Sequence, residues 1–411
     1  MGKNINKKLI CLASAALLAS AGTFAQTADE LLSQGREAFM NYEFDRASQL
    51  YAQAKKKVRK SDEYFADKYD TFNRQLTDAR NFLERVEQIA VIDSLTVPRK
   101  DFFKAYRLPQ SAGTLGNASA LPDKRIEEVN YVFTNEGEDY KLWAQPDTTG
   151  YMHLVESIRM TDGHWTPPSP LSDELAEECD AIFPFMMADG VTLYYASNGD
   201  DSIGGYDIMV ATRDAADGSF LQPSNLGFPY NSPFDDYLLA IDELNGVGWW
   251  ATDRNQLDDE LTIYVFVTND LRKNYSVDEE NLIGFARIDD YIATQPEDSD
   301  YDELLATIRA IDPDAQTLKA EFHFPVHGGK IYHNYEELPD MAARAAMRKY
   351  ISAHNDLSES ERALAALRKE YSKSRSQSAG QKIDKAEQLL NTQRDKVKSL
   401  RNEVYKSLRG K

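Results

Sequence analysis

The residues best suited to chemistry fall within residues 186–214, MMADGVTLYYASNGDDSIGGYDIMVATRD. Asp200, Asp201 and Asp207 place three carboxylates within eight residues there, and calcium prefers oxygen ligands of this kind. Their spacing differs from that of a helical calcium loop, and no bidentate glutamate follows at the required position. The three aspartates are therefore the candidates for a metal site, but a structural loop without a cofactor is the interpretation we favour.

Other reactive sites have less support. Residues 198–205, NGDDSIGG, contain no lysine and precede a strand, so they are not a phosphate-binding loop. No G-x-S-x-G motif occurs, and Cys179 lacks a recognisable partner pattern, so nothing indicates nucleophilic catalysis. Pro325 excludes a regular helix around the only histidine cluster, which favours strand and turn positions over helical zinc ligands. That cluster consists of His323, His327 and His333.

The N-terminus has the pattern of a secretory signal peptide. A basic start is followed by the apolar stretch 9–21 and by small residues up to Ala25, after which we expect cleavage. The apolar stretch is too short to cross a bilayer, and no later apolar run reaches about 18 residues. We therefore expect an exported protein, in the periplasm or associated with the outer membrane, that does not span the membrane. Its one remaining cysteine, Cys179, allows no internal disulfide.

Charge is distributed unevenly along the chain. Residues 121–340 hold 12 Lys and Arg against 45 Asp and Glu, whereas residues 341–411 hold 17 against 8. An acidic centre of this size repels nucleic acid phosphates. In the basic tail the charges alternate in sign, which is typical of solvated helices. Nucleic acid is therefore not an expected partner.

Residues 26–91 are expected to be helical. Small residues and one tyrosine fall at the spacing of a single tetratricopeptide repeat, in which small side chains let two helices approach closely. A further helix over 62–89 would pack on this unit as its cap, because one repeat cannot bury its own apolar face. A peptide groove made by several repeats is not expected. The packing residues are Gly35, Ala47, Tyr51 and Ala54.

Between residues 127 and 338 short apolar runs alternate with turn residues, which indicates strands. Residues 92–126 are predicted to be a linker that could hold the first strands of the propeller. A shift of 55 residues superposes TLYYASN on VGWWATD, and a third copy upstream would place Thr134 and Asn135 at the positions of Ser197 and Asn198. In LYYA and IYVFV both alternating faces are apolar, as expected for propeller blades packed between neighbours. We predict a β-propeller of about four to six blades. The superposed pairs include Asp180 with Asp235, Ser197 with Thr252, and Asn198 with Asp253.

Structural roles explain most of the repeated residues. Asp189 and Gly190 suit a tight hairpin turn, since glycine accepts positive φ and aspartate bonds its own backbone. Gly204 and Gly205 would let the chain cross close to a neighbouring strand. Asp207 could accept backbone amides where its strand begins, and Ser197 and Asn198 could bond main chain where theirs ends.

These residues resemble the WD40-like (PD40) propeller repeat of the TolB type. Asp189-Gly190, Ser197-Asn198 and Gly204-Gly205-Tyr206-Asp207 match its pattern. The arginine expected after Asn198 is absent, but the second copy has Arg254 after Asp253. The stretch NSPFDDYLLAIDE is similar to the blade opening of envelope propellers that accompany OmpA-like domains. The resemblance implies a non-enzymatic role, holding envelope or outer-membrane proteins, although the wall-binding OmpA-like domain of such relatives is missing.

Residues 339–411 are expected to form a helical hairpin or coiled coil. Leu357, Leu364 and Tyr371 recur at seven residues, as do Ile383, Leu390, Val397 and Val404. The two arms would pair with each other and leave an edge that could serve oligomerisation. Together the features predict a scaffold or accessory subunit of an envelope complex. The alternatives are a hydrolase acting on glycan or peptide at the propeller mouth, and a calcium- or glycan-binding module.

Overall fold

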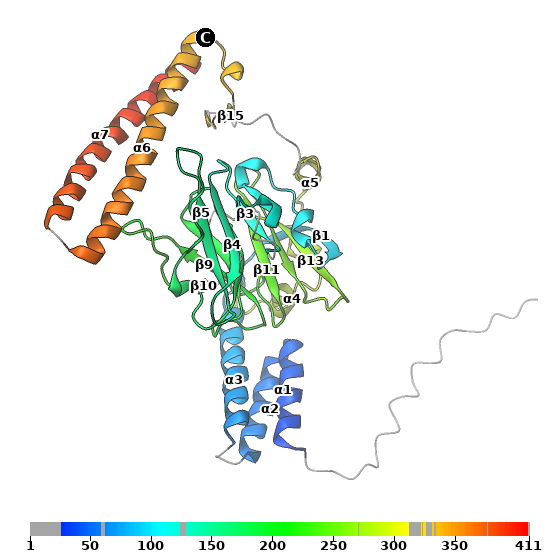
Figure 1. Cartoon of the computed structure of the whole chain (residues 1–411). Helices are drawn as coiled ribbons and strands as arrows, with labels where there is room; N and C mark the ends of the chain where they lie inside the picture. The colour runs from blue at the N-terminus through cyan, green and yellow to red at the C-terminus, as the bar shows by residue number, and fades with distance from the viewer. Residues whose placement is uncertain are drawn as a thin grey trace, which may run out of the picture. The chain divides into compact units, whose positions relative to one another are not determined.

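A computed structural model describes the chain from residue 26 to residue 409 with a few gaps, and it forms N-terminal helices, antiparallel sheets and C-terminal helices (Figure 1). The expected signal peptide and the three clustered histidines lie outside the described residues. Two compact units divide the chain, Met1–Arg80 and Asn81–Lys411. No helix in the described part is long and apolar enough to span a membrane. The described ranges are 26–58, 62–123, 129–269, 271–311, 322, 324–325, 331–332, 334–375 and 377–409.

The first unit begins with the expected helix–turn–helix. Thr27 and Glu30 form a capping box that starts α1 (Ala28–Met40). Helix α2 (Phe44–Lys57) follows after a short turn. Gly35 lies against Tyr51 so closely that a Cβ on the glycine would stand 2.4 Å from the ring. Ala47 and Ala54 are fully buried as well, so small residues lie where α1 and α2 approach each other.

Helix α3 (Glu63–Leu83) packs on this pair, as predicted. The rings of Tyr51 and Phe72 stack with centroids 6.1 Å apart, and Arg36 donates to the Gln75 side chain at 2.8 Å. The helix ends six residues before the predicted boundary at Ile89. The chain beyond it is rich in β-branched residues and becomes strand β1 (Ala90–Pro98), in agreement with their strand preference.

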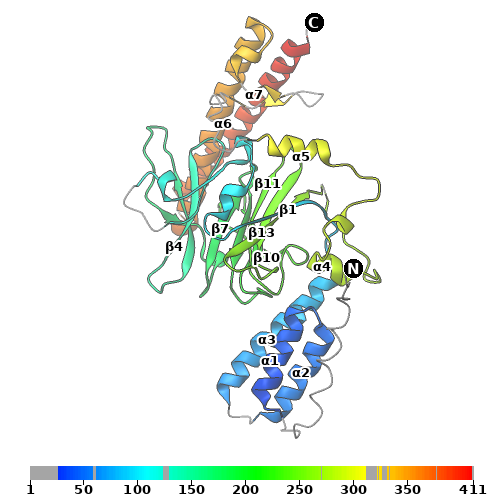
Figure 2. The ribbon, with the colours of Figure 1, turned by 90° about the vertical axis from the view of Figure 1, so that its right-hand side faces the viewer.

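Three antiparallel sheets form the centre of the second unit (Figure 2). The first sheet has the order β2-β3-β4-β5-β6, the second β10-β9-β8-β7, and the third β1-β13-β12-β11. Strand β1 precedes the first sheet in the chain, but it pairs with β13 and is the outer strand of the third sheet. The bounds are β2 Thr114–Gly116, β3 Val132–Thr134, β4 Tyr140–Pro146, β5 Met152–Ile158, β6 Ser169–Pro170, β7 Ala181–Met186, β8 Thr192–Ser197, β9 Asp207–Thr212, β10 Ser224–Asn225, β11 Asp236–Asp242, β12 Val247–Thr252 and β13 Glu260–Val267.

The 55-residue repeat is visible in the backbone of the second and third sheets. Strands β8 and β12 differ by 55 positions at both ends. The register of β7 against β8 shifts after Ile182, and that of β11 against β12 shifts after Tyr237, also 55 residues apart. Within these irregularities Phe183 has φ 53° and Leu238 has φ 41°. Such values are uncommon for bulky residues, so their recurrence at one repeat position shows that the two sheets are built alike.

The first sheet repeats the same plan, but not in the alignment that the sequence predicted. Gly163 and Gly218 both have positive φ, 87° and 79°, and stand 55 residues apart. Strands β6 and β10 also begin 55 residues apart. Thr134 was expected to match Ser197, which ends β8. It lies instead at the end of β3. From its position in the strand order of the first sheet, β3 corresponds to β7 of the second sheet. The predicted alignment of the first sheet was therefore wrong by one strand. Thr134-Asn135 and Ser197-Asn198 each stand at the end of a strand, so the two pairs look alike in the sequence.

An aromatic core fills the space between the inner strands. Phe102, on the 3₁₀ turn η1 (Phe102–Ala105), packs against Phe183 and Tyr237 with ring centroids 5.2 and 6.2 Å apart. The Tyr106 hydroxyl donates to the Leu238 carbonyl at 2.8 Å. The segment expected to be a linker is therefore part of the core.

The described residues do not confirm the predicted propeller of about four to six blades. They build three sheets of four or five strands each, and no closed sheet is found among them. Residues 271–311 form α4 (Leu282–Arg287) and α5 (Asp302–Arg309) rather than further strands. Strand β12 is buried along its whole length, in agreement with the prediction that both faces of the inner strands are covered. A small pair, β14 (Phe324–Pro325) and β15 (Ile331–Tyr332), follows.

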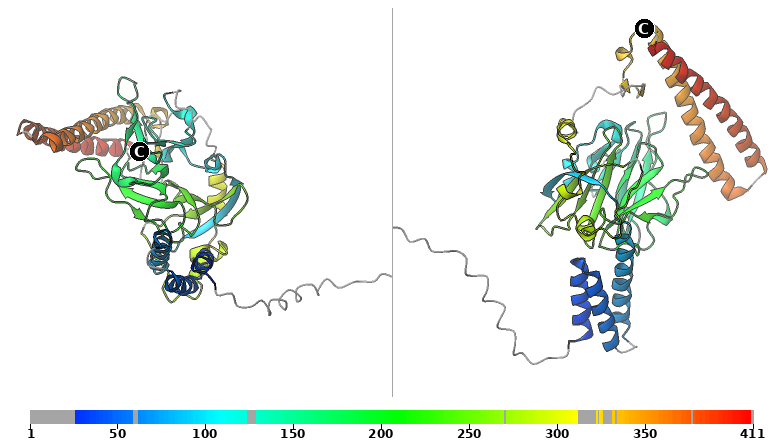
Figure 3. Two further views of the ribbon diagram at one scale, coloured as in Figure 1. Left: turned by 60° about the horizontal axis from the view of Figure 1, so that its bottom comes forward. Right: turned by 180° about the vertical axis from the view of Figure 1, so that it is seen from behind.

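The C-terminal residues form the expected helices, α6 (Met341–Ser374) and α7 (Gln377–Arg409), which pack against each other (Figure 3). The Asp340 side chain caps α6 by accepting from the Ala343 amide at 2.9 Å. Leu364, Leu390 and Val404 of the predicted seams are buried. Ion pairs join the helices along their length: Lys349 with Glu403, Arg394 with Glu361, and Arg368 with Glu387.

Candidate functional site

Asp180 and Asp235 link neighbouring sheets. The Asp180 carboxylate accepts the backbone amide of Met152, at the start of β5, at 2.9 Å. The Asp235 carboxylate accepts the amide of Tyr206, next to the start of β9, also at 2.9 Å. Each aspartate therefore ties the sheet that follows it to the sheet that precedes it. These repeated residues hold the sheets together.

The partners of the two aspartates repeat as well. The Asp180 amide donates to the Asn198 side chain at 2.8 Å, and the Asp235 amide donates to the Asp253 side chain at 2.8 Å. The hydroxyl of Tyr206 adds a bond of 2.6 Å to the Asp180 carboxylate. At the same corner Ser197 accepts the Gly199 amide, and Thr252 accepts the Arg254 amide, both at 3.2 Å.

The glycines allow a close approach between the second and third sheets. A Cβ on Gly204 would lie 1.8 Å from the Phe234 carbonyl oxygen, and one on Gly205 would lie 2.0 Å from the Asp235 carboxylate. In the β7–β8 turn Gly190 has φ 68°. Asp189 accepts the amides of the two residues after that glycine, at 2.8 and 2.9 Å. The predicted turn and crossing roles agree with this geometry.

A change in the motif is compensated within the fold. In the third sheet the Arg254 guanidinium donates to the Tyr230 carbonyl at 2.7 Å and to the Asp236 carboxylate at 2.9 Å. In the second sheet Gly199 stands at the arginine position, and the Tyr195 hydroxyl donates to the Leu175 carbonyl at 2.8 Å instead. Leu175 and Tyr230 are 55 residues apart. Their carbonyls therefore occupy equivalent positions of the repeat and accept hydrogen bonds from different side chains.

The candidate calcium ligands are not brought together. Asp207 is fully buried, and its carboxylate accepts the amides of Ile203 and Gly204 and the side chain of Asn225. Asp200 and Asp201 are exposed. Within the described ranges no group of three or more His, Cys, Asp or Glu side chains could hold a metal ion. The structure therefore gives Asp207 a structural place.

Burial changes the protonation of this region. Loss of hydration, and next the nearby Asp236 carboxylate, raise the pKa of Asp207 to about 8. Burial also raises the pKa of Asp236 to about 6, although Arg254 opposes the change. Neither carboxylate is accessible to a substrate, since both side chains are fully buried.

An acidic groove lies at the junction of the first and second sheets. It consists of two adjoining depressions of about 730 and 620 Å³ that share Tyr151 and the connection from β6 to β7 as lining. The described lining contains no lysine or arginine. Six exposed carboxylates surround the groove: Asp147, Glu174, Glu177, Glu178, Asp200 and Asp201.

Local hydrogen bonds keep part of this groove negatively charged. The Thr149 hydroxyl holds the pKa of Asp147 below its usual value, and the Ser172 hydroxyl does the same for Glu174. His153 lies 3.3 Å from the Asp147 carboxylate. The thiol of Cys179 also lines the groove, and burial raises its pKa. Sequence reasoning found the excess of acidic residues but not this groove.

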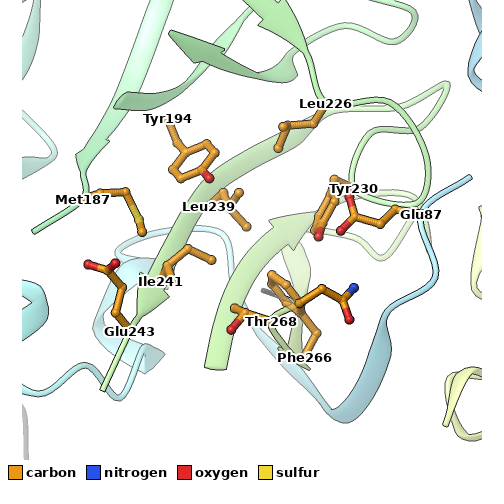
Figure 4. A pocket seen from close by; sticks show the side chains of 11 residues that line it. Glu87, Met187, Tyr194, Leu226, Tyr230, Leu239, Ile241, Glu243, Phe266 and Thr268 are labelled. Atoms are coloured by element: carbon orange, nitrogen blue, oxygen red, sulfur yellow. The ribbon is translucent and has the colours of Figure 1, made fainter. Parts of the chain in front are cut away.

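A second cavity, here called the Glu87 pocket, lies between the second and third sheets (Figure 4). It has a volume of about 360 Å³. Glu87 and Glu243 lie at opposite ends of it, with Tyr194 and Ile241 between them. The remaining lining residues are Met187, Leu226, Tyr230, Leu239, Phe266, Thr268 and Asn269. No sequence motif predicts this pocket, because its residues come from separate segments.

The chain matches no protein family, no curated protein and no solved structure.

Proposed function

We propose that the protein is a non-enzymatic scaffold or accessory subunit of the cell envelope, which holds a basic segment of a partner protein in the acidic groove. The observation that carries this proposal is the ring of six exposed carboxylates around two adjoining depressions. A groove of one charge attracts a partner of the opposite charge and fixes its orientation. The N-terminal signal pattern and the excess of acidic residues support an exported protein of this kind.

In this proposal the three sheets are blades of a TolB-like propeller, of which the described residues form a part. The shared irregularity at Phe183 and Leu238 supports equivalent units. The hydrogen bonds that the Asp180 and Asp235 carboxylates accept join consecutive sheets in the same way. The early strand β1 pairs with β13 and completes the last of the three sheets, which supports a closed arrangement of the sheets. An experimental structure in which the first and third sheets belong to unlike layers would contradict it.

The hydrolase alternative has less support. The two carboxylates with raised pKa values, Asp207 and Asp236, are fully buried and cannot reach a substrate as a general acid. The thiol of Cys179 has a raised pKa, whereas a nucleophilic cysteine needs a lowered one. A calcium-binding module would need gathered ligands, which the described residues do not provide.

The groove can be tested with a defined basic probe. Residues 26–411 would be titrated against a fluorescein-labelled peptide of lysines, with fluorescence anisotropy as the measurement. Neutralising Glu177, Glu178, Asp200 and Asp201 together as amides should weaken binding by roughly tenfold or more, since several charge contacts of modest strength are lost. Added salt should weaken binding of the unmodified protein.

A control with the same change in net charge separates the groove from the overall acidity. Asp258, Asp259, Glu279 and Glu280 are also exposed and lie outside the groove lining. Their four amide substitutions should leave the affinity within about twofold, because a peptide in the groove does not contact these carboxylates and salt screens exposed charges. Equal weakening by both sets would show that the peptide senses net charge only, and the groove proposal would then fail.

A further inference from the structure

The Glu87 pocket combines an apolar body with charged ends. Its lining combines apolar side chains with polar ones. The apolar side chains are those of Leu226, Leu239, Ile241 and Phe266, and the polar ones include Glu87, Glu243, Thr268 and Asn269. A volume of about 360 Å³ is within the usual range for small-molecule sites. Pockets of this type bind ligands through apolar contacts and select them through a few fixed polar groups.

Glu87 is a fixed polar group at one end. Its side chain is mostly buried, and its carboxylate lies 3.5 Å from the Arg272 guanidinium. Asn269 and Tyr230 also hydrogen-bond this carboxylate, and burial raises its pKa. Arg272 therefore compensates the charge of Glu87, and the carboxylate mainly holds Tyr230 and Asn269 in place as a wall of the pocket.

Glu243 supplies a carboxylate at the other end, and among the described residues no ion pair compensates it. It is exposed, and it follows β11 at the rim of the pocket. Tyr194 lies between the two glutamates with its ring toward the apolar wall. Burial, then the charges of Glu87, Asp189 and Glu243, raise the pKa of Tyr194 to about 12. Because Arg272 compensates Glu87, the carboxylate of Glu243 at the rim is the group that favours a cation beside this tyrosine.

We propose that the Glu87 pocket binds a small organic ammonium ion, with its apolar body against Leu239, Ile241 and Phe266 and its nitrogen between Tyr194 and Glu243. An aromatic face next to a carboxylate attracts a cation by both the ring quadrupole and the charge. The apolar walls would exclude a strongly hydrated inorganic cation, which has no apolar body to bury. This site is separate from the acidic groove, so either proposal can fail without the other.

Three probes of one shape test the proposal: 2-phenylethylamine, the neutral 2-phenylethanol and the anion 3-phenylpropionate. Binding to residues 26–411 would be measured by saturation-transfer NMR and calorimetry. We expect the amine to bind at least fivefold more tightly than the alcohol, and the anion to bind least. Equal affinity for amine and alcohol, or failure of the amine to bind the folded protein, would overturn the proposal.

Substitutions locate the site. Glu243→Gln should weaken the amine at least fivefold and leave the alcohol unchanged, because only the charge contact is removed. Tyr194→Ala should weaken both probes. Glu279→Gln removes an exposed charge outside the pocket and should change neither. Glu243 is on the surface, so its variant should keep the melting temperature of the parent. Amine binding that Glu243→Gln does not alter would contradict the assignment.

Discussion

At the scale of single residues, the repeat preserves backbone interactions more strictly than side chains. The carbonyls of Leu175 and Tyr230 are both satisfied, the first by a tyrosine hydroxyl and the second by Arg254. The sequence showed that Gly199 lacks the arginine of the motif. It did not show the replacement, because nothing in the pattern says where the hydroxyl of Tyr195 points. A missing motif residue therefore did not mean a missing interaction.

The buried carboxylate of Asp207 should make stability depend on pH. Its pKa is about 8 in the folded protein, against 3.8 for the unfolded chain. Between these values the folded state holds a proton that the unfolded state releases. The contribution of Asp207 to the free energy of unfolding should therefore be largest below about pH 4. It should fall as the pH rises to 8, by up to about 1.4 kcal/mol per unit. Urea unfolding at a series of pH values measures this slope.

Two variants assign the slope to this residue. Asp207→Asn removes the titrating group, so its stability should decline less between pH 5 and 8 than that of the parent, whatever its absolute stability. Asp201→Asn alters an exposed neighbour in the same loop and should leave the slope unchanged. If Asp207→Asn shows the slope of the parent, the proton is held elsewhere.

At the scale of elements, periodicity predicted the helices and the type of the strands. Apolar residues at seven-residue spacing identified the terminal helices, and doubly apolar runs identified β8 and β13. Strand bounds in the first sheet were missed, because the repeat there is carried by Gly163 and the residues after it rather than by the Ser-Asn pair. The role of β1 was also missed, since its partner β13 is distant in sequence.

Adjacent leucines in α7 allow a matched test of the helical hairpin. Leu390 is 3% exposed, whereas Leu389 is 55% exposed. Leu390→Ala removes buried methyl groups and should destabilise the hairpin by about 2–3 kcal/mol. Leu389→Ala keeps helix propensity and should change stability by less than about 0.5 kcal/mol. Circular dichroism melts at 222 nm would report both, and equal losses would show that the seam between α6 and α7 is misassigned.

At the scale of the whole molecule, composition predicted an acidic protein but not where the acidic residues act. The groove takes its carboxylates from the β4–β5 hairpin, the β6–β7 connection and the loop after β8. Only the packing of one sheet on the next brings these segments together. The same is true of the Glu87 pocket, where Glu87 and Glu243 are 156 residues apart. Sites assembled between repeated sheets leave no local motif.

The three sheets should unfold as one cooperative unit. They share one buried core, which includes Phe133 of the first sheet, Phe185 of the second and Trp249 of the third. Strand β1 adds a connection between the start of the sheet region and its last sheet. We expect this common core to make the three sheets unfold cooperatively, as small single domains do. Tryptophans on different sheets should therefore report the same transition.

Single-tryptophan variants make this measurement possible. One variant would keep Trp143 of the first sheet and the other Trp250 of the third, with the remaining tryptophans replaced by phenylalanine. Both residues are buried, so their fluorescence should change on unfolding. After correction for the stability of each variant by circular dichroism, the two urea midpoints should coincide with the loss of sheet signal. Different midpoints by fluorescence and circular dichroism within one variant would mean that the first and third sheets unfold separately. The prediction of one cooperative unit would then be wrong.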